Sequence, residues 1–215
     1  MVKIAPSILA ADLLKIENEV INVDNAGAEH IHIDIMDGHY VPNISFGPNI
    51  VKSLRPITNK LLDVHLMISP VLPYIHEFIS AGADIISFHP EADENPKQII
   101  KTIESSGCKT GIAIHPKIEI EKITNFLNEI DLVVVMTVIP GFGGQKFLYD
   151  QVSKIKKLFE LRQSMKANFE IEIDGGINKE TSKICIENGA DVLVAGSYIY
   201  GSPEIEYKQL INAIR

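Results

Sequence analysis

The chain has 215 residues, of which 46% are hydrophobic, and its formal net charge is −8. This length and apolar content suit one compact domain with a sizeable core, within the size range of a small (β/α)8 barrel. The acidic balance argues against a nucleic-acid partner, which needs a basic face, but not against an anionic substrate, because backbone N–H groups also bind phosphate.

The chain shows no mark of export or membrane insertion. Its first residues carry no signal-peptide pattern, and no apolar run approaches the length of a membrane span. Cys108 and Cys185 lie far apart and lack a metal-ligand spacing, so we interpret them as reduced thiols. These features predict a cytoplasmic protein without a membrane partner.

Eight short apolar runs, each bounded by turn signals, predict eight strands. In chain order they are Lys3–Ser7, His30–Met36, Leu61–Ile68, Asp84–His89, Thr110–His115, Leu132–Val138, Glu170–Asp174 and Val192–Gly196. Helical patterns lie between them, such as Leu13–Ala26, Ile99–Ser106 and Gln151–Met165. This alternation predicts a parallel sheet, and eight units predict a closed (β/α)8 (TIM) barrel, a single α/β domain over residues 1–215. An open doubly wound sheet is disfavoured, because no Gly-x-Gly-x-x-Gly follows the first run.

A weak repeat marks the passage from helix to strand. Gly27, Gly82 and Gly189 each follow a helical pattern and precede an expected strand. Glycine at such a position suits a helix C-cap in the left-handed region. The repeat therefore indicates recurrent junctions within one domain.

Alternation along the strands separates an aliphatic face from a polar one. In the second run isoleucines occupy one face, while His32 and Asp34 occupy the other. The same parity places His65 and Asp174 opposite the aliphatic residues of their own runs. In a barrel the polar face points inward, and these residues lie toward the C-terminal strand ends, which carry the active site. Buried charges there should pair or bind a metal.

Other polar residues have simpler interpretations. We interpret Asp37 as a turn cap, and Glu170 and Glu172 as part of a polar network near the barrel bottom. The remaining histidines assigned to structural or surface roles are His30, His39, His76 and His115.

The four converging residues predict a metal site that acts on a carbonyl compound. Two imidazoles and two carboxylates match the ligand preferences of Zn²⁺, Fe²⁺, Mn²⁺ or Co²⁺. Such an ion polarises a carbonyl and stabilises an enediolate. Asp34 and Asp174 would also supply two bases on opposite sides of a planar intermediate, which epimerisation next to a carbonyl requires.

Glycine-rich turns follow the last three strands and predict a phosphate site. They are Pro140–Gln145, Asp174–Gly176 and Ala195–Ser197, and the third leads into Tyr198–Tyr200, a candidate short helix. Loops after strands seven and eight with a helix N-terminus form the common phosphate site of this fold. The inward-facing methionines predict an apolar cage that shields the intermediate from water: Met36, Met67 and Met136.

Several strings resemble one family throughout the chain. The strings are HIDIMDGHYVPN at 32–43, LDVHLM at 62–67, MTVIPGFGGQ at 136–145, IDGGIN at 173–178, APS at 5–7 and VAGS at 194–197. They are similar to the signatures of ribulose-phosphate 3-epimerases, barrel enzymes of the ribulose-phosphate-binding type. The family interconverts D-ribulose 5-phosphate and D-xylulose 5-phosphate in the pentose phosphate pathway.

The resemblance implies a role for each site residue and a homo-oligomer. Asp34 and Asp174 would be the proton acceptor and donor. One divalent metal per subunit would be bound by His32, Asp34, His65 and Asp174. The sugar phosphate would be contacted by Ser7, His65, Gly141, Phe142, Gly143, Gly144, Asp174, Gly175, Gly176, Gly196 and Ser197. Segments 37–48 and 140–147 are candidate lids, because both follow site-bearing strands and have Gly or Pro at their ends.

Three alternatives remain open. Allulose-6-phosphate 3-epimerase is similar in fold and chemistry, but as a family it tends to have Ala in place of Gly143 and Ser in place of Gly176. A sugar-phosphate decarboxylase would carry Asp-x-Lys-x-x-Asp on the third strand, whereas Asp63 is followed here by Val64 and His65. A non-catalytic phosphate sensor would not need two carboxylates and two imidazoles at the phosphate end.

Overall fold

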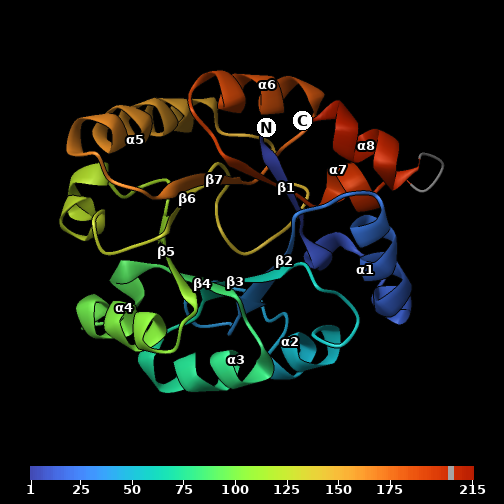
Figure 1. The fold of residues 1–215 in the computed structure, drawn as a ribbon, viewed down its shortest axis with the longest axis horizontal. Helices are drawn as coiled ribbons and strands as arrows, with labels where there is room; N and C mark the ends of the chain where they lie inside the picture. Colours follow the sequence, from blue (N-terminus) through green and yellow to red (C-terminus); the bar gives the residue numbers. More distant parts are fainter. Residues whose placement is uncertain (203–205) are drawn as a thin grey trace.

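A computed structural model describes residues 1–202 and 206–215, and its centre is a ring of parallel strands (Figure 1). The strands are β1 Lys3–Pro6, β2 His30–Met36, β3 Leu61–Met67, β4 Ile85–Phe88, β5 Lys109–Ile114, β6 Leu132–Met136, β7 Glu170–Asp174 and β8 Val192–Ala195. Hydrogen-bonded neighbours follow the order β1-β8-β7-β6-β5-β4-β3-β2. A parallel bridge between Ser7 and His32 brings β1 against β2. The (β/α)8 barrel prediction is therefore confirmed.

The α-helices surround the strands in Figure 1. They are α1 Ile16–Asn25, α2 Pro48–Leu54, α3 Ile75–Ala81, α4 Pro96–Ser105, α5 Val152–Met165, α6 Lys179–Glu187, α7 Ser197–Tyr200 and α8 Tyr207–Ala213. Between β5 and β6 the chain forms only two short 3₁₀ helices, Ile120–Lys122 and Thr124–Phe126, so this connection departs from a regular βα unit. Within residues 1–202 and 206–215, no helix is long and apolar enough to cross a membrane.

The expected element boundaries differ from the observed ones by a few residues. The pattern expected at Leu13–Ala26 begins with a 3₁₀ turn, Leu13–Lys15, before α1. The helix α4 begins at Pro96, earlier than the expected Ile99, because proline suits the first helical turn, where its missing N–H costs no hydrogen bond. The left-handed prediction is confirmed for Gly27, Gly82 and Gly189, whose φ angles are 95°, 102° and 105°.

The strand parity expected from the sequence is observed. The isoleucines of β2 pack in one buried cluster with Val20 of α1 and Val51 of α2, so they form the interface between sheet and helices. A second cluster, which includes Val134 and Met136, occupies the other face of the strands. Full burial of each large aliphatic side chain contributes about 1.5–3 kcal/mol, so the outer interface holds the ring in place. The inner face therefore holds both apolar side chains and the buried polar residues His32, Asp63 and His65.

Candidate active site

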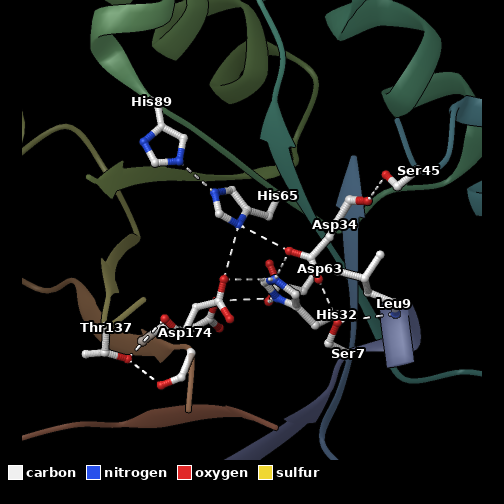
Figure 2. A network of polar contacts seen from close by, with 12 residues as sticks. Ser7, Leu9, His32, Asp34, Ser45, Asp63, His65, His89, Thr137 and Asp174 are labelled. Atoms are coloured by element: carbon white, nitrogen blue, oxygen red, sulfur yellow. Dashed lines mark hydrogen bonds and ion pairs between the residues drawn. The ribbon is translucent and has the colours of Figure 1, made fainter. Parts of the chain in front are cut away.

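Strand register brings the four predicted metal ligands to one end of the barrel. In the β2–β3 pair, His32 lies opposite Asp63 and Asp34 lies opposite His65. Asp174 is the last residue of β7. Figure 2 shows the side chains of these strands pointing toward a common centre. His32, Asp34 and His65 are buried, and the Asp174 side chain is 13% exposed.

The spacing of the donor atoms fits a divalent metal ion. His32 Nε2 lies 3.5 Å from Asp34 Oδ1 and 4.0 Å from Asp174 Oδ2, and His65 Nδ1 lies 3.6 and 3.5 Å from the same oxygens. Four ligands about 2.1 Å from a tetrahedral zinc ion would be about 3.4 Å apart. Among the described residues, neither His32 Nε2 nor His65 Nδ1 has a hydrogen-bond partner, although both atoms are buried. The donor set therefore fits such an ion in both chemistry and spacing.

Each of the two predicted ligand histidines is held through its other ring nitrogen. His32 Nδ1 lies 2.8 Å from Asp63 Oδ2, and His65 Nε2 lies 3.0 Å from His89 Nε2. Such partners orient a ligating imidazole and fix its tautomer. The sequence prediction omitted Asp63 and His89 from the site. Both alternate with aliphatic residues, Asp63 along β3 and His89 directly after β4, so they lie on the inner face, but which histidine each one meets depends on the packing between strands.

Electrostatics at the centre favours ionised carboxylates. Burial alone would lower the pKa of His32, but the neighbouring carboxylates of Asp63 and Asp34 outweigh it and raise that pKa well above its usual value. Burial opposes ionisation of Asp34, yet the two imidazoles lower its pKa. Burial lowers the pKa of His89 to about 4. The centre thus combines the charged carboxylate of Asp34 with the neutral imidazole of His89, which lies beyond His65.

The two aspartates approach the centre from different directions. Around the ring β2 and β7 are separated by β1 and β8, so they stand three positions apart, close to the opposite placement expected for two bases. Ser7 Oγ donates a hydrogen bond of 2.6 Å to Asp34 Oδ2. Thr137 Oγ1 donates one of 2.6 Å to the carbonyl of Gly175, directly after Asp174. The first contact restricts the Asp34 carboxylate, and the second holds the backbone next to Asp174.

A cleft that opens to solvent lies over the centre. Its walls include the three methionines and every predicted substrate residue except His65, which is buried beneath. The predicted residues on the walls are Ser7, Gly141, Phe142, Gly143, Gly144, Asp174, Gly175, Gly176, Gly196 and Ser197. Pro140 and Gln145, the ends of the first predicted turn, also line the cleft, whereas the sequence prediction missed Leu9, Ala10, Val138, Ile177 and Val194. The missed residues are apolar and carry no chemical signal in the sequence.

Contacts between loops shape the cleft. Asn43 Nδ2, in the segment after β2, donates a 2.7 Å hydrogen bond to the carbonyl of Gly141 after β6. Gln145 Nε2 donates to the carbonyls of Ile139 and Phe142 at 2.6 and 2.8 Å. The two candidate lid segments are therefore bonded to each other. The short helix expected near Tyr198 is confirmed as α7, which begins at Ser197 beside the cleft.

Among the residues interpreted as structural, Asp37 and Glu170 have identifiable hydrogen-bond partners. Asp37 Oδ1 accepts hydrogen bonds from the N–H groups of His39 and Tyr40, which confirms the turn cap. Glu170 accepts from Lys3 Nζ at 2.5 Å at the start of the strands. Glu172 is fully buried, and burial followed by the charge of Asp63 raises its pKa well above normal.

Comparison with known proteins gives one consistent family. Residues 3–200 match the model described as the ribulose-phosphate 3 epimerase family. A curated ribulose-phosphate 3-epimerase from Bacillus subtilis is 47% identical, over 100% of this chain and 99% of that protein. A ribulose-phosphate 3-epimerase from Chlamydia trachomatis is 43% identical, over 98% and 91% of the two chains.

Solved structures support the fold from more distant proteins. A KGPDC from Streptococcus mutans has a TM-score of 0.78 at 15% identity, over 99% of this chain and 95% of that one. A thiamine phosphate pyrophosphorylase from Pyrococcus furiosus has a TM-score of 0.67 at 17% identity, over 100% and 94%. At such identities the likeness concerns the barrel alone.

Proposed function

The chain belongs to the ribulose-phosphate 3-epimerase family, and on that premise we propose that it interconverts D-ribulose 5-phosphate and D-xylulose 5-phosphate with Asp34 and Asp174 as two separate bases. The observation that supports this mechanism is that the carboxylates of Asp34 and Asp174 converge beneath one cleft with two imidazole nitrogens. Among the described residues these nitrogens, on His32 and His65, have no hydrogen-bond partner. The enzyme is an isomerase.

His32, Asp34, His65 and Asp174 would hold one divalent ion per subunit, drawn from Zn²⁺, Fe²⁺, Mn²⁺ and Co²⁺. When bound, such an ion acts as a Lewis acid toward the carbonyl and hydroxyl oxygens of the substrate. Although burial opposes ionisation of Asp34, the imidazoles of His32 and His65 lower its pKa, which favours the ionised form that a base requires.

Inversion at carbon 3 requires one group on each face of the reacting carbon. One carboxylate takes the proton from carbon 3, and the C–H electrons pass into an enediolate. The protonated carboxyl of the other aspartate then donates its proton to the opposite face, so the two aspartates exchange protonation states in each turnover. Ser7 restricts Asp34 through its 2.6 Å hydrogen bond, which keeps that oxygen in place during the transfer.

The remaining walls would bind the phosphate and exclude water. The turns at Gly175–Gly176 and Gly196–Ser197 present backbone close to the cleft, next to the start of α7. Met36, Met67 and Met136 are each at most 3% exposed and border the same cleft, where they would shield the enediolate from water. We further propose that residues 1–215 form one domain, of the ribulose-phosphate-binding type, and that the enzyme is a cytoplasmic homo-oligomer that binds no nucleic acid.

Turnover in deuterated water tests the two-base assignment. The product should carry solvent deuterium at carbon 3, because the returning proton comes from a different carboxyl group. Asp34→Asn and Asp174→Asn should each lower kcat by at least about 10²–10⁴, the usual contribution of a positioned proton-transfer group. Efficient transfer of the substrate's own carbon-3 hydrogen into the product would overturn the assignment.

A further inference from the structure

We propose that His89 is the positioning residue of the metal ligand His65, acting as a neutral acceptor that keeps the His65 Nδ1 lone pair aimed at the metal centre. Glu91 and Tyr40 in turn hold His89. This inference rests on the proposed function, because it assumes that the four converging residues bind a divalent ion.

The contact between the two imidazoles permits one proton arrangement when a metal is bound. His65 Nδ1 faces Asp34 and Asp174 and must be unprotonated to act as a ligand. The proton of His65 then lies on Nε2, which is 3.0 Å from His89 Nε2. His89 Nε2 must therefore accept, and its own proton must lie on Nδ1.

The surroundings of His89 favour that tautomer. Its Nδ1 lies 3.6 Å from Glu91 Oε1, which places the Nδ1–H near a carboxylate oxygen. The same oxygen accepts a 2.8 Å hydrogen bond from the Tyr40 hydroxyl. Protonation of Nδ1 is thus favoured electrostatically, while Nε2 keeps its lone pair for His65.

Ring packing fixes the orientation of His89. The fully buried imidazole lies between two rings, with centroid distances of 5.1 Å to His65 and 4.8 Å to Tyr40 and interplanar angles of 31° and 33°. Figure 2 shows His89 on the side of His65 away from Asp34 and Asp174. Tyr40 belongs to the segment after β2, so the series of polar contacts through His89 and Glu91 extends from His65 to a candidate lid.

The two ligand histidines are supported by chemically different partners. Asp63 gives His32 a carboxylate, whereas His89 gives His65 a neutral nitrogen. Replacement of His89 therefore alters the orientation of His65 without removing a negative charge from the centre. Loss of such a partner lowers metal affinity by about 10- to 100-fold.

Metal titration of three purified full-length variants tests this role. His89→Leu removes the acceptor, His89→Gln keeps an acceptor oxygen near the position of Nε2, and His115→Leu makes the same change at a histidine that follows β5. Zn²⁺ affinity is measured by chelator competition, and Co²⁺ absorption reports the ligand geometry. Thermal unfolding of the metal-free proteins measures the structural cost of each change.

The expected result is a Zn²⁺ affinity about 10- to 100-fold weaker in His89→Leu, near wild type in His89→Gln, and unchanged in His115→Leu. Equal affinity in His89→Leu and wild type would overturn the inference, as would equal losses in His89→Leu and His89→Gln. If His89→Leu does not fold, His89→Asn replaces it, because the shorter amide does not reach His65. Wild-type protein that binds no divalent ion would instead refute the proposed metal site.

Discussion

A side chain at Gly176 should displace the loop that follows β6. A Cβ there would lie 2.8 Å from both the N and Cα atoms of Phe147, and the glycine has a φ of 68°. Because the contact is with backbone, rotation of a side chain does not relieve it. Gly176 also borders the cleft, so the shift would alter the proposed phosphate side of the site.

The expected destabilisation for Gly176→Ala has two parts. A left-handed conformation costs an L-residue about 1–2 kcal/mol, and overpacking costs about 1–3 kcal/mol. The free energy of unfolding should therefore fall by about 2–5 kcal/mol. In a chain of this size each kcal/mol lowers Tm by about 2–4 °C, which gives a Tm lower by about 4–20 °C.

Gly143→Ala is the matched control. The nearest atom to a Cβ at Gly143 is Leu9 Cδ2 at 3.9 Å, an ordinary contact distance, so its Tm should stay close to that of wild type. Thermal unfolding is measured for both variants, and the KM for ribulose 5-phosphate is measured for Gly176→Ala, where it should rise. A Tm within about 2 °C of wild type with unchanged KM in Gly176→Ala would refute the reasoning. Equal destabilisation by Gly143→Ala would do the same.

Two further predictions concern the metal and the lids. Removal of bound metal with a strong chelator should abolish epimerisation, and Zn²⁺, Mn²⁺, Fe²⁺ or Co²⁺ should restore part of it; full activity in rigorously metal-free protein would contradict the metal requirement. Binding of a substrate analogue should protect segments 37–48 and 140–147 in hydrogen exchange, because Pro140–Gln145 border the cleft and Asn43 of the other segment is bonded to Gly141. Unchanged protection of both segments would argue against a lid role.

Local periodicity was sufficient for the fold class and for the inward-facing residues. The alternation of isoleucine with His32 and Asp34 in β2 identified the buried faces, because successive strand side chains point to opposite sides whatever the partner strand is. The glycines at helix ends could likewise be predicted, since a left-handed C-cap depends on a few consecutive residues. The resemblance of the motif strings to one family added a prediction of the family and of site residues such as Ser7 and Gly176.

Contacts between strands depended on the tertiary structure. The β2–β3 register determines that His32 meets Asp63, and the packing of β4 beside β3 determines that His65 meets His89. A barrel fixes this stagger through its closure, which involves all eight strands and leaves no short-range signal. Parity could therefore place Asp63 and His89 inside the barrel, but only the closed ring assigned Asp63 to His32 and His89 to His65.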